Sequence, residues 1–296
     1  MKSGFVAIIG KPNAGKSTLL NTLLNKKLAI TTYKAQTTRN SILGILNKEG
    51  LQIVFIDTPG IHEAKTYLGA YMNKEAYAQA NGADLIYYMV DATKGLNKQD
   101  KEVLDKLFSY DIPVFCIFNK IDEVASDKLL ERCNYAAKNY DFKEIIPISA
   151  LEKENLEELL KTTEEYMNDG VLYYPEDQDE ISTLEFKISE IVREKIILNT
   201  YEEVPHLTAV KIDEYKESEA RVKIEASIIV NKQSHKGIII GKQGAMLKKI
   251  NMAASKEIKE LLGKKVVLSL YVKVEEDWLN KEKKLFDLGY FNEWSN

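Results

Sequence analysis

The sequence predicts an α/β fold, a mostly parallel sheet with helices on both faces, followed by a smaller α+β domain. Three observations predict it. Short apolar runs alternate with helically spaced segments over the first 170 residues, and a glycine-rich phosphate loop directly follows the first run. After residue 173 the pattern changes to alternating strands between amphipathic helices. The 296 residues, 45% hydrophobic and 29% charged, are enough for two globular domains.

Six short apolar runs are the candidate strands of the first domain. They lie at 5–9, 41–47, 51–56, 84–90, 112–118 and 143–148. Their continuous apolar character predicts burial on both faces, and the second strand could run antiparallel to its neighbour. Helical spacing predicts helices at 16–25, 66–80, 97–108, 125–138 and 155–167. Polar motifs follow the strands, at the sheet edge where open α/β folds bind ligands.

The phosphate loop covers residues 10–17 and reads Gly-Lys-Pro-Asn-Ala-Gly-Lys-Ser. Its glycines let the backbone wrap closely around phosphate oxygens, and the following helix N-terminus faces the negative charge. Lys16 is expected to reach the β- and γ-phosphates, and the Ser17 hydroxyl to ligate Mg²⁺. The predicted phosphate-binding residues are Asn13, Ala14, Gly15, Lys16, Ser17 and Thr18.

Two further motifs are expected at the γ-phosphate. Asp57 ends the third apolar run and is predicted to hold Mg²⁺ through water, while Gly60 offers its N–H to the γ-phosphate. The polar stretch 36–39 resembles a GTPase switch region, which points to Thr38 as the hydroxyl that closes over Mg²⁺, with Thr37 as the alternative. The predicted catalytic residues are Lys16, Thr38 and Gly60.

A guanine-recognition motif, Asn119-Lys-Ile-Asp122, follows the fifth apolar run. Asp122 can accept from both N1–H and the N2 amine of guanine, donors that adenine lacks at those positions. Asn119 can serve the N7 side of the base, and the Lys120 stem can cover the ring face. A third base-contacting loop is expected at Ser149, Ala150 and Leu151. The first domain is therefore predicted to bind GTP and to hydrolyse it.

The residue after Gly60 bears on how water attacks the nucleotide. Ras-like enzymes carry a water-orienting Gln there, whereas this chain has Ile61. Water positioning is then expected from backbone, another side chain, a monovalent cation or a partner, with low intrinsic turnover. Asn13 in the phosphate loop makes K⁺ a candidate. His62 is expected to be an exposed switch residue rather than a base.

The second domain has a different order of elements. A Pro-containing acidic stretch at 173–180 predicts a linker, followed by a helix to about 198, strands at 206–215 and 220–230, and a short helix at 234–240. A Gly-x-x-Gly loop, a second helix and a strand at 265–274 complete it. This order resembles a type II KH domain. The predicted boundaries are 1–172, 173–180, 181–276 and a tail at 277–296.

The charge of the second domain favours RNA. The whole chain has a net charge of −4, but residues 231–273 contain ten lysines and two glutamates, a local charge of +8. A tight glycine loop between helix ends can press backbone N–H groups against a single-stranded phosphate backbone. Binding through such a basic face should weaken with salt. The predicted RNA-binding residues are Lys236, Ile239, Gly241, Lys242, Gln243, Gly244, Lys248 and Lys249.

Together these motifs resemble the bacterial Era family over essentially the whole chain. The matching segments are 10–17, 34–39, 57–62, 119–122 and 235–244, with 274–278 and 287–290 in the tail. The resemblance implies assembly of the small ribosomal subunit through binding near the 3′ end of 16S rRNA, with GTP, GDP and Mg²⁺ as ligands. It also implies a cytoplasmic protein, expected to be a monomer, with peripheral membrane association as a further option.

Several alternatives are open at this point. A signalling GTPase with a protein- or membrane-binding C-terminal domain, or a GTPase coupled to RNA modification, would share the first domain. Apolar residues of the tail could form an interfacial stripe, although packing onto the KH domain is favoured: Trp278, Leu279, Leu285, Phe286 and Leu288. No apolar run approaches 18 residues, which predicts no membrane span. Cys116 and Cys133 lack metal-ligand spacing, so a reduced, cytosolic chain is expected.

Overall fold

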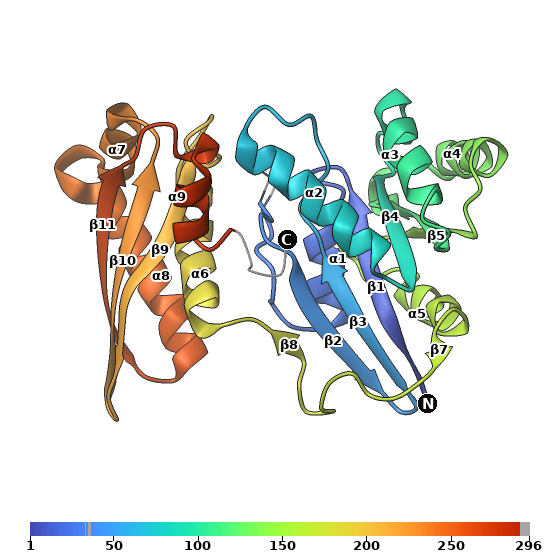
Figure 1. Cartoon of the computed structure of the whole chain (residues 1–296), viewed down its shortest axis with the longest axis horizontal. Coiled ribbons are helices and arrows are strands. Elements are labelled where there is room, and N and C mark those ends of the chain that lie inside the picture. The colour runs from blue at the N-terminus through green and yellow to red at the C-terminus, as the bar shows by residue number, and fades with distance from the viewer. Residues whose placement is uncertain (33, 35–36, 291–296) are drawn as a thin grey trace. The chain divides into compact units, whose positions relative to one another are not determined.

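The computed structural model describes residues 1–32, 34 and 37–290 (Figure 1). The chain divides into two compact units. The first comprises Met1–Lys65 and Gly69–Ile181, and the second comprises Thr66–Leu68 and the chain from Ser182 onward. The unit boundary thus lies after the segment predicted as a linker, because residues 173–181 are held against the first unit.

A largely parallel sheet forms the centre of the first unit. Its strand order is β6-β5-β4-β1-β3-β2-β8, and β7 pairs with β1. Strands β1, β3, β4, β5 and β6 run parallel, while β2 runs antiparallel to β3. The strands are β1 (Lys2–Gly10), β2 (Ile42–Lys48), β3 (Leu51–Asp57), β4 (Leu85–Asp91), β5 (Val114–Asn119), β6 (Glu144–Ile148), β7 (Asn168–Asp169) and β8 (Glu180–Ile181).

Helices cover both faces of this sheet, as predicted (Figure 1). Helices α2, α3 and α4 contribute apolar side chains to one buried cluster with β1, β4 and β5. The opposite face carries α5, whose Thr163 hydroxyl bonds that of Tyr87, and α1, whose Leu20 lies against Gly44 of β2. The helices are α1 (Lys16–Leu23), α2 (Tyr67–Asn81), α3 (Lys98–Phe108), α4 (Ser126–Asn139) and α5 (Leu156–Glu165).

The second unit has a three-stranded sheet of order β11-β10-β9, with β9 antiparallel and β11 parallel to β10. Alternate residues of β10 face a core built with α6 and α8, which confirms the predicted alternation. The two glycines of the Gly-x-x-Gly loop fall between α7 and α8. The elements are α6 (Leu184–Asn199), β9 (Thr208–Glu217), β10 (Arg221–Val230), α7 (Gln233–Ile240), α8 (Ala245–Leu262), β11 (Lys265–Val274) and α9 (Glu282–Asp287).

The described part of the tail packs within the second unit. Trp278 is fully buried, its indole stacks on Tyr290 with ring centroids 6.0 Å apart, and its Nε1–H donates to the Leu207 carbonyl at 3.1 Å. Leu279 and Leu285 are buried as well, and among the apolar tail residues that the structure describes only Phe286 is largely exposed. Packing, rather than an interfacial stripe, therefore accounts for most of this segment.

Replacing Trp278 with phenylalanine is expected to lower the free energy of unfolding of the second unit by about 1–3 kcal/mol. The change keeps an aromatic ring but removes the donor to the Leu207 carbonyl and part of the buried indole. Urea denaturation of the two proteins measures the difference. The half-exposed Phe286, replaced by leucine, is the control and should stay within about 0.5 kcal/mol. Equal stability of Trp278→Phe and wild type would contradict the packing role.

Candidate functional site

The phosphate loop joins the C-terminal end of β1 to the N-terminus of α1. Gly15, the residue before α1, has a left-handed φ of 97°, and a Cβ there would lie 2.1 Å from the Asn119 amide nitrogen. Glycine is thus required both by the backbone and by the close approach of the base-recognition loop. The first turn of α1 points its free N–H groups into the space the loop surrounds.

Lys16 is buried at the base of the loop. Its ammonium donates to the carbonyls of Gly10 and Lys11, at 3.2 and 3.1 Å. Burial lowers the pKa of Lys16 to about 8, and attraction to Asp57 opposes part of that fall. Phosphate oxygens placed beside this ammonium would favour its charged form, so the site is built to gain stability from an anion.

Three oxygen-bearing side chains meet at the mouth of the loop. The Ser17 hydroxyl donates to Asp57 Oδ2 at 2.6 Å, and its oxygen lies 2.8 Å from that of Thr38. Thr38 is buried and also lies 3.4 Å from Asp57 Oδ2, whereas the Thr37 hydroxyl donates to the Lys34 carbonyl. Between the two threonines considered, the geometry therefore favours Thr38.

Asp57 has the environment of a cation ligand. It is fully buried, and burial raises its pKa to about 6 against the opposing attraction of Lys16. Its second carboxylate oxygen, Oδ1, is buried and has no hydrogen-bond partner in the part of the chain that the structure describes. An unpaired buried oxygen is costly, and one carboxylate with two hydroxyls suits Mg²⁺, which binds few protein ligands together with phosphates.

A pocket at the phosphate loop is lined by Lys16, Ser17 and Thr38. Gly60 closes one side of it, and a Cβ there would lie 2.8 Å from the Pro12 nitrogen, so only glycine lets the two loops approach. Gln36 of the predicted switch stretch lies outside the described part of the chain. The pocket is lined by Pro12, Asn13, Gly15, Lys16, Ser17, Thr18, Ile30, Thr31, Thr32, Thr37, Thr38 and Gly60.

The surroundings of the two residues after Gly60 do not favour a water-orienting role for either side chain. Ile61 is only 7% exposed and belongs to the apolar core beneath α2 and α3. His62 is half-buried rather than exposed as predicted, because Asn73 bonds both its backbone N–H (3.3 Å) and its carbonyl (2.7 Å). The His62 ring lies 2.9 Å from the Gly60 carbonyl.

Asn119 joins the phosphate loop to the base-recognition loops. Its amide donates to the Ala14 carbonyl at 2.8 Å and accepts from the Ala150 N–H at 2.9 Å. Any contact with N7 of a base must therefore use the second amide N–H. Ser149 and Ala150 are buried behind this link, and Leu151 is 70% exposed.

Asp91 is a site residue that the sequence did not reveal. It ends β4, and its carboxylate accepts from the Lys120 ammonium at 2.8 Å and from the backbone N–H and hydroxyl of Thr93. Burial opposes ionisation of Asp91, but these hydrogen bonds hold its pKa below the usual range. The ion pair fixes the Lys120 side chain, two residues before Asp122, which is exposed. The sequence signal that could have identified Asp91 is its position at the C-terminal end of a strand, where open α/β folds bind ligands.

The Gly-x-x-Gly loop of the second unit presents open backbone. Gly241 has a φ of 71°, and a Cβ there would lie 2.7 Å from that of Met246. Gly244 has a φ of 77°, and a Cβ there would meet no atom within 4 Å. Both have a left-handed backbone that favours glycine, but of the two only Gly244 faces open space.

The predicted RNA-binding residues around this loop differ in their exposure. Lys242, Gln243, Lys248 and Lys249 are exposed, and Lys236 is half-buried. Ile239, predicted to contact RNA, is instead fully buried in the core of the unit. Its neighbour Ile238 is 47% exposed, so Ile238 is the isoleucine available to a ligand at this point.

Comparison with known proteins agrees with both units. Residues 5–120 match a family described as 50S ribosome-binding GTPase, and residues 203–279 match the KH domain family. No helix in the described part of the chain is long and apolar enough to span a membrane.

Two solved structures resemble the whole chain. One is an Era variant from Aquifex aeolicus bound to GDP and AlF4⁻, 42% identical, covering 99% of this chain and 100% of the other, with a TM-score of 0.95. The second is Era in complex with MgGDPNP and nucleotides 1506–1542 of 16S ribosomal RNA, with the same identity and coverage and a TM-score of 0.96.

Proposed function

Because the chain belongs to the Era family of GTPases, we propose that it binds GTP and GDP with Mg²⁺, binds 16S rRNA through its KH domain, and acts in assembly of the small ribosomal subunit. The observation that carries the proposal is the convergence of Ser17, Thr38 and Asp57 at a phosphate loop, in a chain that also holds an open, lysine-flanked Gly-x-x-Gly loop. The 42%-identical relative binds MgGDPNP and 16S rRNA nucleotides 1506–1542.

We propose a role for each group of the nucleotide site. Lys16 binds the β- and γ-phosphates, and the Gly60 N–H binds the γ-phosphate. Ser17 and Thr38 would be the direct Mg²⁺ ligands, and Asp57 would hold the ion through water, using the carboxylate oxygen that has no hydrogen-bond partner among the described residues. Mg²⁺, when bound, neutralises charge on the phosphates. Asp122 selects guanine, and Asp91 holds the Lys120 side chain through an ion pair.

Water positioning is assigned to the phosphate loop and a monovalent cation. Ile61 is buried in the core, so its side chain cannot orient water. Asn13 is exposed at the loop with a left-handed φ of 64°, which suits a residue that contributes to a K⁺ site. Hydrolysis in K⁺ is expected to be about tenfold faster than in Na⁺, a modest share of what one charge-stabilising group contributes.

Replacing Asn13 with alanine should remove the difference between K⁺ and Na⁺. Phosphate release under saturating GTP, measured for both proteins in both salts at equal ionic strength, tests this. Rates that do not change when K⁺ is replaced by Na⁺ in the wild type would rule out the cation route.

We propose that the RNA affinity of the KH domain depends on whether GTP or GDP is bound. Mg²⁺-GTP is expected to order the segments around Thr38 and Gly60 and thereby change RNA affinity. A ligand shifts such an equilibrium only by its differential affinity for the two arrangements. The signalling and RNA-modification alternatives are not adopted, because the KH match and the RNA-bound relative both favour RNA binding.

The RNA half of the proposal is tested with a labelled RNA that covers the 3′ end of 16S rRNA. Fluorescence anisotropy at increasing salt should show binding whose logarithmic affinity falls linearly with the logarithm of salt concentration. An RNA of the same length and scrambled sequence is the control. Failure to prefer the 16S sequence would contradict specific rRNA recognition.

The proposed location is the cytoplasm, where ribosomal subunits assemble. Peripheral membrane association stays a prediction from family resemblance. Of the tail residues that could carry it, Trp278, Leu279 and Leu285 are buried in the second unit, and Phe286 is exposed.

A further inference from the structure

Residues 173–181, here called the strap, connect the two units and are held along the outer strands of the first sheet. The strap begins at Gln52 of β3, whose side chain is completely buried. The Gln52 carbonyl oxygen accepts from the backbone N–H groups of Tyr173 and Tyr174, at 2.8 and 3.1 Å, and its amide donates to the Tyr174 carbonyl at 2.9 Å. A buried amide thus substitutes for a strand partner.

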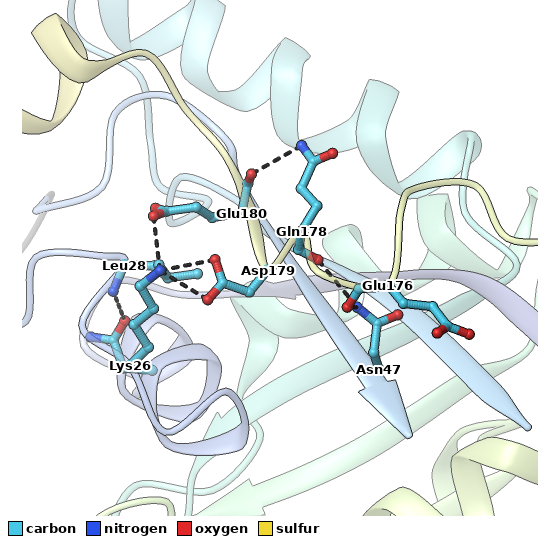
Figure 2. Close-up of polar contacts among 8 residues, drawn as sticks. Lys26, Leu28, Asn47, Glu176, Gln178, Asp179 and Glu180 are labelled. Atoms are coloured by element: carbon cyan, nitrogen blue, oxygen red, sulfur yellow. Dashed lines mark hydrogen bonds and ion pairs between the residues drawn. The ribbon is translucent and has the colours of Figure 1, made fainter. Parts of the chain in front are cut away.

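Asn47 of β2 holds the middle of the strap (Figure 2). Its amide donates to the carbonyls of Glu176 and Gln178, at 3.0 and 3.2 Å. Gln52 in turn donates to the Asn47 carbonyl oxygen at 2.8 Å, which orients the amide toward the strap. These contacts involve backbone atoms of the strap, so they fix its path whatever its side chains are.

Lys26 holds the end of the strap. Its ammonium lies 2.9 Å from both carboxylate oxygens of Asp179 and 3.1 Å from Glu180 (Figure 2). Lys26 follows α1 closely, so this clamp ties the strap to the helix that starts at the phosphate loop. Because Lys26 and Asp179 are exposed, the ion pairs add little to overall stability.

The strap ends as an added strand beside the predicted switch. In β8, Ile181 pairs with Leu43 and Glu180 with Gly44 of β2, and the Ile45 N–H donates to the Asp179 carbonyl at 2.9 Å. Leu43 lies five residues after Thr38, and Ile181 lies three residues before the first residue of α6. The pairing of β2 with β8 therefore links two short chain segments. One leads from Leu43 back to the proposed Mg²⁺-binding Thr38, and the other leads from Ile181 to α6, the first helix of the KH unit.

We propose that Lys26 and Asn47 are positioning residues that keep the strap docked on β2, so that nucleotide-dependent movement around Thr38 reaches the start of α6 and sets RNA affinity. The inference rests on the proposed function. A docked strap moves with β2, whereas a released strap is a flexible chain that transmits no displacement. The coupling between GTP and RNA then depends on contacts that touch neither ligand.

The test compares RNA affinity in two nucleotide states. The 16S 3′-end RNA is titrated into the full chain loaded with GDP or with a non-hydrolysable GTP analogue. Wild type is expected to show at least an approximately fivefold difference, a usual size for allosteric coupling. In Lys26→Gln with Asn47→Ala the difference should fall below about twofold, with GTP affinity and hydrolysis unchanged. The matched control is Lys48→Gln, an exposed lysine at the far end of β2, which should keep the wild-type difference.

Hydrogen exchange of residues 173–181 shows whether the double variant has released the strap. A released strap with the wild-type affinity difference would overturn the inference. If the strap stays protected in the double variant, a second variant with Gly-Gly-Ser inserted between Ile181 and Ser182 tests the inference. The insertion adds flexible chain between the strap and α6 and leaves every contact of the strap in place. Coupling that survives this insertion also overturns the inference.

The wild-type result separates this inference from the proposed function. Equal RNA affinity of the GDP and GTP-analogue forms would contradict both the role of the strap and the proposed nucleotide switch, while the proposal of RNA binding would stand. Absence of RNA binding in either form would instead contradict the RNA half of the proposed function.

Discussion

Replacing Asp122 with asparagine is expected to weaken GTP binding by roughly 10³-fold or more, the penalty of a site built to hydrogen-bond a group that it can no longer bind. The carboxylate accepts two donors from guanine, whereas an amide in its place can accept from N1–H but turns its own N–H donors toward the guanine amine. Xanthine has a carbonyl where guanine has its amine, so xanthosine triphosphate should bind the variant better than GTP does.

The geometry makes this substitution a clean test of base recognition. Asp122 is exposed in a short 3₁₀ turn at Ile121–Glu123, so the change removes no core contact. Asn119 and Lys120 keep their own partners, the Ala14 carbonyl and Asp91. Displacement of a fluorescent nucleotide by GTP, ATP and xanthosine triphosphate measures the effect.

The matched control is Glu123→Gln, a neighbouring exposed carboxylate that should leave GTP affinity within about twofold. Two outcomes would contradict the assignment of Asp122: GTP affinity preserved in Asp122→Asn, or equal loss for GTP and xanthosine triphosphate.

Replacing Gly244 with aspartate is expected to weaken RNA binding about 100-fold and to leave GTP binding intact. A carboxylate at this position repels the phosphate backbone, and its side chain blocks the access of RNA to the backbone N–H groups of the loop. Because a Cβ at Gly244 meets no atom within 4 Å and aspartate tolerates a left-handed backbone, the fold should survive. Gly241 is a poorer choice, since its Cβ would lie 2.7 Å from that of Met246.

Gly263→Asp provides the matched control. Gly263 ends the same helix, α8, has a φ of 65° and also faces open space, so it shares the strain and the charge of the test variant. Anisotropy with the 16S 3′-end RNA should show near-wild-type binding for Gly263→Asp. Equal losses in both variants would point to net charge alone, and no loss in Gly244→Asp would contradict an RNA-binding role of the loop.

Much of the fold could be predicted because its signals are local. Apolar runs fixed the central strands to within a few residues, and the alternation in 220–230 placed Val222, Ile224 and Ile228 on the core face of β10, as observed. The phosphate-loop motif requires a strand before it and a helix after it, so it predicted β1 and α1 as well. Ser17 and Asp57 could be named from their motifs, and Thr38 from the resemblance of its segment to a GTPase switch region, with Thr37 as the alternative; the structure brings Ser17, Thr38 and Asp57 together.

The misses have physical causes. Residues 238–240 are three consecutive isoleucines on a short helix, so no pattern fixes which one faces the core, and Ile239 does. Strand β8 has two residues, too few for any periodicity, and its docking depends on side chains from Lys26, Asn47 and Gln52 far away in sequence. Asp91 pairs with Lys120, 29 positions later, and only the folded sheet brings the two together.

The most direct test of the central claim is co-sedimentation of the chain with small ribosomal subunits, in Mg²⁺ with either GDP or a non-hydrolysable GTP analogue. A GTPase switch that acts through rRNA predicts binding that prefers the analogue, is weakened by salt, and is lost in Gly244→Asp. Binding in neither state, by protein whose GTP binding is intact, would contradict the account.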